Sequence, residues 1–341
     1  MKSIFFPAEW YPQSGIQLTW PHSDSDWADN LDEIVECYIT ISKEIIKREK
    51  LIIVTAPDSD VKQFFTEEDL ENITFTEIQI NDTWARDHGA ISAFIYEQPT
   101  LIDFGFNGWG LKFAANHDNL LARNLMTKSV FKTEVGYRSH LNFILEGGSI
   151  ETDGNGTLLT TSKCLLASNR NQPMEREDIE DYLKKALGQD RVLWLNYGLL
   201  LGDDTDGHID TLARFCSEDT IAYVKCDDTN DPHYLELKLM EVELKSFVTT
   251  KGKSYKLVPL PMADPLYGNS GYLPATYANF LIINGAVLVP TYGTAKDEIA
   301  KKQLQKLFPD REIVGINSIP LIKQHGSLHC VTMQFPEGFV R

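Results

Sequence analysis

A repeated alternation of helical and strand-like segments constrains the fold of this chain more than any other feature. Helical patterns begin at intervals of about 60 residues, near Ala114, Pro173, Pro232 and Ala295. Three of them are followed by short apolar segments typical of buried strands, at residues 192–195, 255–260 and 313–316. A constant period of this kind is typical of stacked β/α units. We therefore expect an α/β fold, with the chain forming a single domain over residues 1–341.

The N-terminal part of the chain shows the same order of elements. Apolar residues recur with helical spacing from Leu31 to Ile45, after the polar stretch Asp24-Ser25-Asp26, which is a typical helix start. Residues 51–55 are apolar and predict a buried strand. The repeated order therefore begins close to the N-terminus.

Composition restricts the classes of partner. Of the 341 residues 43% are hydrophobic, yet no apolar run reaches the roughly 18 residues that a membrane span requires. We therefore expect no membrane partner. The formal charge of −17, from 49 acidic and 32 basic residues, disfavours nucleic acid as a partner but permits cationic ligands. The sequence leaves assembly into a homo-oligomer open.

Cysteine usage and the N-terminus predict a cytoplasmic protein. The five cysteines lack CxxC spacing, so neither a disulfide framework nor a zinc knuckle is indicated. The segment from Met1 to Pro7 is too short, and too soon broken by proline, to be a signal peptide. A reducing cytoplasm fits both observations.

Four polar clusters separate the predicted elements, and the first of them spans residues 81–89. The ring of Trp84 precedes the carboxylate of Asp87 by three residues, and a ring face with an anion suits a cationic ligand. Alternatively, Arg86 could brace the loop by pairing with an acidic neighbour. The first cluster thus predicts either a cation site or a structural loop.

The second cluster places two glycines directly after Glu146. Gly147 and Gly148 would leave space beside the carboxylate, or they would serve a turn that needs positive φ. The sequence favours neither interpretation over the other.

The third and fourth clusters add a histidine, a carboxylate and an amide. His208 and Asp210 are two residues apart, so on a strand they would share one face and supply either a proton shuttle or two metal ligands. Asn279 is either a hydrogen-bonding wall of a site or a turn residue. Further along, Cys330 lies between a glycine-containing turn and an alternating apolar strand, a place that suits a nucleophilic thiolate or a structural thiol.

Together these stretches resemble the agmatine deiminase / bacterial peptidyl-arginine deiminase family of the guanidino-group-modifying (pentein) superfamily. The matching stretches occur in the family's order over almost the whole chain, at residues 7–10, 18–21, 81–87, 103–110, 146–149, 205–210, 279–280 and 329–330. Two stretches depart from the family pattern. The approach to Cys330, residues 324–328, has fewer glycines than usual, and His88-Gly89-Ala90 stands where the family has Thr-Gly-Pro.

The resemblance implies a five-bladed α/β propeller with pseudo-fivefold symmetry and one site residue per blade at the central axis. It implies that Cys330 is the nucleophile, that His208 is the acid/base and that Glu146 is the carboxylate holding this histidine. Asp87 and Asp210 would bind the guanidinium.

Two further residues complete the implied substrate site. Trp84 would line the pocket, and Asn279 would form part of its wall.

The implied reaction is hydrolysis of a C–N bond of an amidine. Two carboxylates hold the planar guanidinium while the thiolate attacks its carbon, and His208 protonates the departing ammonia. The covalent thiouronium on Cys330 is then hydrolysed by a water that His208 deprotonates. No metal or organic cofactor is required. For agmatine the products are N-carbamoylputrescine and ammonia, a step of polyamine biosynthesis toward putrescine.

Several alternatives remain open at this point. A metal-dependent hydrolase would use His208, Asp210, His329 and Cys330 as ligands. A non-catalytic cation-binding propeller would leave the cysteine and histidine without a role. An amidinotransferase would share the nucleophile but use an amine in place of water.

Agmatine is the substrate that we expect, with arginine and peptidyl-arginine as alternatives. The α-carboxylate of arginine would need a cation in the pocket, and only Lys112 stands near a family motif. Asp203 and Asp204 lie shortly before His208 in sequence, so an acidic loop would approach the site. We expect Asp204 to contact the distal ammonium of agmatine; otherwise it belongs to a solvated turn.

Overall fold

The computed structural model describes residues 3–269 and 271–341. Its strands are β1 (Ile4–Phe5), β2 (Gln13–Thr19), β3 (Lys50–Thr55), β4 (Ile73–Glu77), β5 (Ile91–Ile95), β6 (Gln98–Gly105), β7 (Gly136–Ile144), β8 (Ile150–Thr152), β9 (Thr157–Thr161), β10 (Arg191–Leu195), β11 (Ala213–Ser217), β12 (Thr220–Lys225), β13 (Lys256–Pro261), β14 (Tyr267–Gly268), β15 (Gly271–Tyr272), β16 (Leu281–Ile283), β17 (Ala286–Thr291), β18 (Glu312–Asn317) and β19 (Thr332–Pro336). Its α-helices are α1 (Leu31–Ile46), α2 (Glu67–Leu70), α3 (Ala85–His88), α4 (Gly108–Leu111), α5 (Leu121–Met126), α6 (Ser162–Leu165), α7 (Arg176–Leu187), α8 (Tyr234–Ser246), α9 (Ala295–Leu307) and α10 (Ile319–Ile322). Its 3-10 helices are η1 (Ala28–Asn30), η2 (Val61–Phe64), η3 (Asp118–Leu120), η4 (Gly147–Ser149) and η5 (Ile209–Thr211).

One arrangement of strands recurs along the chain. Among the described residues, the strands form five sheets of three or four strands and the small hairpin β14–β15. In four sheets an antiparallel pair is followed by a helical crossover and a third strand parallel to the second: β5–β6–β7, β8–β9–β10, β11–β12–β13 and β16–β17–β18. A parallel pair needs such a crossover connection, which explains the regular alternation in the sequence. The predicted α/β fold is confirmed.

The fifth sheet joins the two ends of the chain. Strand β19 pairs antiparallel with β2, placing Met333 opposite Gln17, and β2 pairs parallel with β3 across α1. This sheet therefore has the same antiparallel-then-parallel order, but its first strand comes from the C-terminal part of the chain.

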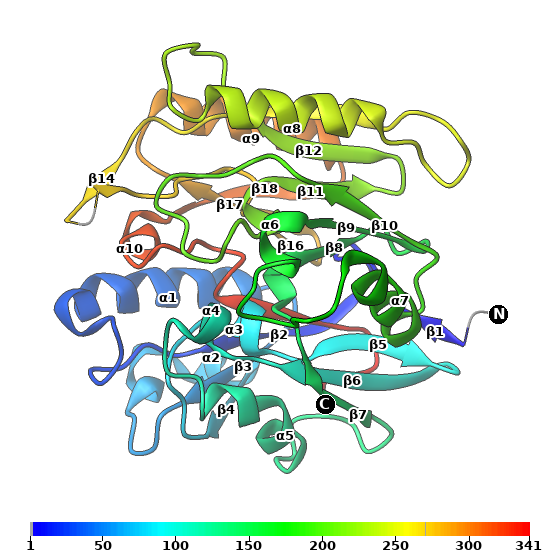
Figure 1. Ribbon diagram of the computed structural model, residues 1–341. Helices are drawn as coiled ribbons and strands as arrows, with labels where there is room; N and C mark the ends of the chain where they lie inside the picture. The colour runs from blue at the N-terminus through cyan, green and yellow to red at the C-terminus, as the bar shows by residue number, and fades with distance from the viewer. Residues whose placement is uncertain (1–2, 270) are drawn as a thin grey trace.

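The long helices α1, α7, α8 and α9 lie on the outside of the sheets (Figure 1). The helix predicted over residues 31–45 is confirmed as α1, in which Ile34, Tyr38, Ile41 and Ile45 are fully buried. Its apolar stripe faces the core, as expected for an amphipathic surface helix. The helix predicted near Ala114 begins later, at α5, because the 3-10 turn η3 precedes it.

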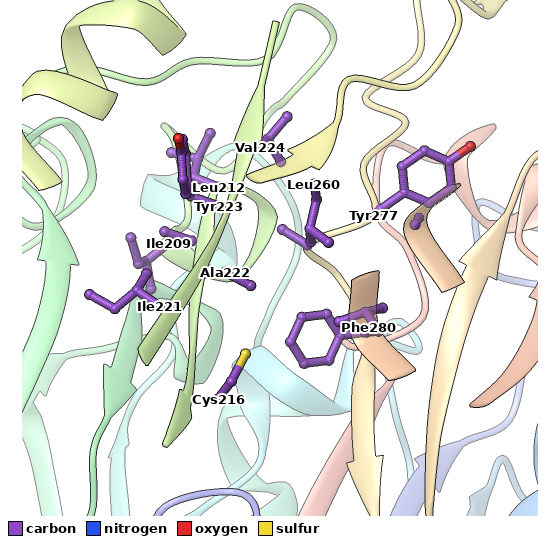
Figure 2. Close-up of a cluster of buried hydrophobic side chains, with 14 of the residues drawn as sticks. Ile209, Leu212, Cys216, Ile221, Ala222, Tyr223, Val224, Leu260, Tyr277 and Phe280 are labelled. Atoms are coloured by element: carbon purple, nitrogen blue, oxygen red, sulfur yellow. The ribbon is translucent and has the colours of Figure 1, made fainter. Parts of the chain in front are cut away.

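The hydrophobic core connects neighbouring sheets and fixes the backbone beside the polar clusters. Figure 2 shows Leu260 of β13 near Phe280, and both side chains are fully buried. Burying a side chain of this size contributes about 1.5–3 kcal/mol. Phe280 directly follows Asn279, and the fully buried Ile209 directly precedes Asp210. Core packing therefore anchors the segments that carry these polar side chains.

Over the described residues, no helix combines the length and the apolar character that crossing a bilayer requires.

Candidate active site

The polar residues singled out in the sequence occupy equivalent places in the five sheets. Each lies in the short segment that leads into the first strand of an antiparallel pair: Asp87 before β5, Glu146 before β8, His208 and Asp210 before β11, Asn279 before β16 and Cys330 before β19. The contacts described below bring these segments together at one site. The site opens into a pocket of about 240 Å³, which Trp84, Asp87 and Cys330 help to line.

The thiol of Cys330 faces an amide and a carboxylate. Its side chain is 4% exposed, with Sγ 3.4 Å from Oδ1 of Asn279 and 3.8 Å from Oδ2 of Asp210. Burial raises the pKa of the Cys330 thiol well above its usual value, and the charges of Asp210 and Asp87 raise it further. In the unliganded site the sulfur is therefore a thiol, and a cation placed between it and the carboxylates would favour the thiolate.

Asp87 is buried and held by two N–H donors. The indole Nε1 of Trp109 donates to Oδ2 at 3.0 Å, and the backbone N–H of Gly148 donates to Oδ1 at 3.0 Å. Burial raises the pKa of Asp87 to about 6, while the charge of His208 opposes this shift. The carboxylate is ionised at neutral pH and becomes protonated in mildly acidic solution.

His208 is fully buried, and a ring nitrogen lies within 4.8 Å of the thiol of Cys164, which interacts with it. Nδ1 of His208 lies 3.6 Å from Oδ1 of Asp87. Burial lowers the pKa of His208, but the charge of Asp87, the neighbouring Cys164 and the charge of Glu146 together outweigh burial and raise the pKa well above the usual value. The ring is therefore an imidazolium.

The expectation that His208 and Asp210 share the face of a strand is wrong. His208 caps η5 and Asp210 lies within it, and β11 begins only at Ala213. Gly207 precedes them with φ +84°, so the chain turns sharply here instead of extending. The two side chains still reach one site because this turn is buried against the core.

Glu146 is held by an arginine that the sequence reasoning missed. Nε of Arg170 lies 3.0 and 3.1 Å from the two carboxylate oxygens of Glu146, and both side chains are fully buried. Arg170 also binds Asp206, at 2.6 Å. Glu146 lies within 4.8 Å of a ring nitrogen of His208, so in this arrangement it acts on the histidine through charge.

Gly148 has no side chain because three functional groups occupy the space. A Cβ at this position would lie 2.7 Å from Nδ1 of His208, 2.8 Å from Oδ1 of Asp87 and 3.1 Å from Oδ2 of Asp210. Neither Gly147 nor Gly148 has positive φ among the described residues. The glycines are therefore explained by close approach, not by a left-handed turn.

Asn279 joins two of the site segments. Its Oδ1 accepts the backbone N–H groups of His329, at 2.8 Å, and Cys330, at 3.4 Å, and its Nδ2 donates to the backbone oxygen of Asp210 at 3.3 Å. Asn279 could have been a hydrogen-bonding residue of the site wall or a turn residue. These contacts agree with the first interpretation.

Behind the site lies a buried ionic network that the sequence reasoning did not predict. His329 lies between Asp210, 2.8 Å from Nδ1, and Glu9, 2.7 Å from Nε2. Arg214 donates to Glu9 at 2.7 Å and also forms an ion pair with Glu151. Glu9 and His329 stand in stretches that resemble the family, which was the one available signal.

The pocket is lined by several acidic side chains. Asp26, Asp82, Asp203 and Asp204 line it, and the lining residues described include no lysine or arginine. Burial and the neighbouring Asp203 raise the pKa of Asp204 to about 6. Lys112 does not line the pocket; its Nζ binds the backbone oxygen of Asp204 and the carboxylate of Asp206.

The walls of the pocket are aromatic. Trp84, Trp109 and Phe113 contribute to the lining. Gly326 packs directly against the Trp84 ring, so that a Cβ on Gly326 would overlap ring atoms at 2.0 Å. Aromatic faces beside carboxylates suit a ligand with both apolar and cationic parts.

The predicted metal-ligand set of His208, Asp210, His329 and Cys330 is not assembled as one cluster among the described residues. The clusters with metal-like spacing are instead Glu146–Cys164–His208 and Glu9–Glu151–His329. Arg170 binds Glu146, and Arg214 binds both Glu9 and Glu151. A guanidinium therefore already neutralises the carboxylates in each cluster.

Comparison with known proteins agrees with this geometry. Residues 5–336 match the Porphyromonas-type peptidyl-arginine deiminase family. A solved chain from Porphyromonas gingivalis, provisionally described as an arginine deiminase, is 53% identical with a TM-score of 0.96, covering 99% of this chain and 100% of that one. The agmatine deiminase of C. jejuni, solved with substrate bound, is 39% identical with a TM-score of 0.91, covering 99% and 97%. The agmatine deiminase of Stutzerimonas stutzeri is 30% identical over 99% of this chain and 96% of its own length.

The matches extend over nearly the whole length of both partners. The cysteine, histidine and carboxylates of the resembling motifs lie at one site, where Asp87 and Cys330 line the pocket. This protein therefore belongs to the Porphyromonas-type peptidyl-arginine deiminase family.

Proposed function

We propose that this protein is an agmatine deiminase, which hydrolyses agmatine to N-carbamoylputrescine and ammonia. The observation that carries the proposal is a pocket lined by Cys330 and Asp87, with Asp210 3.8 Å from the sulfur, and by four further aspartates. Its described lining residues include no lysine or arginine. Agmatine is a dication with a guanidinium at one end and an ammonium at the other. Two of the relatives above are named agmatine deiminases.

In the first half of the reaction, the guanidinium lies between Asp87 and Asp210 with its carbon at the sulfur of Cys330. Its positive charge offsets the two carboxylates that hold the thiol protonated, so the thiol loses its proton to solvent and attacks. His208, as an imidazolium, protonates the departing amino group. Ammonia leaves, and a thiouronium remains on Cys330.

In the second half, the now neutral His208 takes a proton from water, and the resulting hydroxide attacks the thiouronium carbon. Collapse of this adduct breaks the C–S bond, regenerates the thiolate and releases the urea product. Glu146 supports both halves by adding negative charge near His208. Arg170 keeps Glu146 in place through its two contacts with the carboxylate.

The fold that we propose is a single domain built as a five-bladed propeller around a pseudo-fivefold axis. Five sheets share one strand order, and each has a candidate site residue just before its first antiparallel strand. Blades around an axis would bring those five equivalent positions to the centre.

The acidic lining of the pocket favours agmatine over arginine or peptidyl-arginine. The α-carboxylate of arginine would face these aspartates, and Lys112 is already engaged by the backbone oxygen of Asp204 and the carboxylate of Asp206. The carboxylate of Asp204 is half-buried at the pocket, where the charges of His325 and Lys112 act on it. We assign it the distal ammonium of the substrate.

Ammonia release from agmatine, free arginine and a peptide with C-terminal arginine tests the assignment. We expect turnover with agmatine that exceeds the other two by at least about 10²-fold in kcat/KM, since each wrong substrate buries an unpaired carboxylate. Equal or greater turnover of arginine would overturn the substrate but retain the deiminase chemistry. When primary amines are added, the yield of the urea product should still equal the yield of ammonia. If the added amine were instead converted to a guanidino compound, the reaction would be an amidino transfer.

We also propose a cytoplasmic location. All five cysteines are free and buried, and a reducing compartment preserves the thiol that the reaction needs.

A further inference from the structure

The side chains of two adjacent residues face different cavities. Cys330 lines the substrate pocket, whereas His329 lines a separate cavity of about 40 Å³ together with Glu9, Arg86 and Glu151. His329 is 2% exposed and is not among the residues that line the substrate pocket. Its two ring nitrogens contact Asp210, Glu9 and Arg214, so it is placed to act on the reaction through a neighbour.

That neighbour is Asp210. Nδ1 of His329 lies 2.8 Å from Oδ2 of Asp210, and because a carboxylate only accepts, the ring donates its Nδ1–H. The other oxygen, Oδ1, is buried and has no hydrogen-bond partner among the described residues. One oxygen of Asp210 is thus fixed from behind, while the other remains available for an N–H donor.

The imidazole of His329 is also held at Nε2, the ring nitrogen that points away from Asp210. Its Nε2 lies 2.7 Å from Oε2 of Glu9 and 3.1 Å from Nη2 of Arg214. Oε1 of Glu9 accepts the backbone N–H of Ile282 at 2.7 Å, and Arg214 donates to the backbone oxygen of Phe280 at 2.6 Å. The ring therefore connects Asp210 to a rigid framework from the N-terminal segment, β11 and β16.

We propose that His329 is a positioning residue that holds the Asp210 carboxylate in the orientation that binds the guanidinium. The proposal rests on the proposed function, in which Asp210 is a guanidinium ligand. A carboxylate can rotate about its terminal torsion. Without the Nδ1–H donor, the carboxylate of Asp210 keeps only the long contact of 3.8 Å between its Oδ2 and Sγ of Cys330 among the described hydrogen bonds. A displacement of about 1 Å at such a ligand can cost roughly 10²-fold in rate.

Two substitutions separate the two sides of the ring. The amide nitrogen of Asn superposes on imidazole Nδ1, so His329→Asn keeps a donor for Asp210. The amide of Gln superposes on Nε2, so His329→Gln keeps the contact with Glu9 and loses Asp210. We expect His329→Asn to stay within about 5-fold of wild-type kcat/KM and His329→Gln to lose about 10²-fold, mainly through KM. The control is His140→Asn, on β7 at a distance from the site, which should match wild type.

A double-mutant cycle distinguishes positioning from a general structural role. If His329 acts through Asp210, then His329→Gln in an Asp210→Asn background should change kcat/KM by less than about 2-fold. Three outcomes would each overturn the proposal. They are a further loss of about 10²-fold in kcat/KM in the Asp210→Asn background, equal losses for His329→Asn and His329→Gln, and wild-type kcat/KM in His329→Gln. If His329→Gln gives no cooperative thermal transition, Glu9→Gln replaces it in the same cycle, because it removes the charge that holds the far side of the ring.

The outcome can be read separately from the substrate assignment. The cycle uses whichever guanidino compound the wild-type protein turns over. Binding of the guanidinium ion itself to Cys330→Ser protein, measured by calorimetry, provides a second readout that needs no turnover. Weaker guanidinium binding in the Gln variant but not in the Asn variant supports the positioning role even if agmatine is not the substrate, and unchanged binding in both contradicts it.

Discussion

The protonation state of Cys330 depends on the carboxylates that face it. Burial, Asp210 and Asp87 all keep its pKa high in the unliganded site. A cationic substrate offsets this local negative charge, so that binding and activation of the nucleophile become one event. Such a cysteine stays unreactive until the correct ligand arrives.

Cys330→Ser should reduce ammonia release from agmatine to below roughly one per cent of wild type, because a serine hydroxyl is far less ionised than a thiol. The melting temperature should hardly change, since the substitution is nearly isosteric. Cys226→Ser, remote from the pocket, is the matched control and should retain full activity. Residual turnover of several per cent would remove Cys330 from the nucleophile role.

Gly148→Ala should lower kcat/KM by about 10²-fold or more. The new Cβ would lie within 3.1 Å of functional groups of His208, Asp87 and Asp210, all three of which would have to shift. Gly136→Ala, on β7, meets only side-chain ends at 3.2 and 3.3 Å and serves as the control. Steady-state kinetics measures kcat/KM of both variants, and circular dichroism checks that both are folded. Near-normal kcat/KM in Gly148→Ala would contradict the site geometry.

The pH dependence of kcat/KM should show an acid limb near pH 6. Asp87 has a raised pKa of about 6, so protonation removes its attraction for the guanidinium as the pH falls through this value. Asp204, also at about 6, should make the fall steeper for agmatine than for butylguanidine, which lacks the distal amine. A flat kcat/KM between pH 7.5 and 5 for both compounds would show that neither carboxylate must be ionised.

Loops rather than regular elements supply most of the polar side chains of the pocket, and buried contacts make these loops rigid. In the loop before η5, Asp203 accepts the N–H groups of Thr205 and Gly207, and Asp206 binds Arg170. The neighbouring Asp204 is left with its carboxylate toward the pocket. The loop thus uses some carboxylates for its own structure and presents one to a ligand.

Asp204→Asn should raise KM for agmatine about 10-fold or more, because the ammonium loses a charged partner. KM for butylguanidine should barely change, because that compound has no ammonium. Asp227→Asn removes an exposed carboxylate remote from the pocket and controls for net charge. If Asp204→Asn changes KM equally for both compounds, or for neither, Asp204 does not bind the ammonium and belongs to a solvated turn.

Three of the sheets are tied together by ionic contacts as well as by the hydrophobic core. Arg214 of β11 is fully buried and binds Glu9 from the N-terminal segment, Glu151 of β8 and the backbone oxygen of Phe280. It thus connects the N-terminal segment with three sheets at one point.

Arg214→Met should destabilise the whole molecule by about 3–5 kcal/mol, because it leaves Glu9 and Glu151 buried without their main partner. Urea unfolding followed by circular dichroism measures the change. Arg176→Met on α7 breaks a half-exposed ion pair with Glu180 and should cost less than about 1 kcal/mol. Equal stabilities of the two variants would show that Arg214 has no special role in holding the sheets together.

The order of elements and the family could be predicted from the sequence because both depend on local information. The spacing of apolar residues sets α1, α7, α8 and α9, and the motifs around Asp87, Glu146, His208 and Cys330 appear in the linear text. By contrast, the 3-10 turn at His208 could not be predicted. His208 and Asp210 are two residues apart in sequence whether the backbone is a strand or a turn, so their separation alone does not distinguish the two conformations.

The tertiary structure alone decided which residues share the site and what each contributes. Arg170 with Glu146, and Arg214 with Glu9, are far apart in sequence, and no local pattern marks them as partners. The need for a glycine at position 148 likewise follows only from the folded structure, in which side chains of His208, Asp87 and Asp210 occupy the space that a Cβ would take. The amino-acid sequence by itself determined the elements and the chemical groups, because these follow from nearest neighbours along the chain. Their distances, burial and charge balance depend on contacts between distant segments, which form only when the sheets pack together.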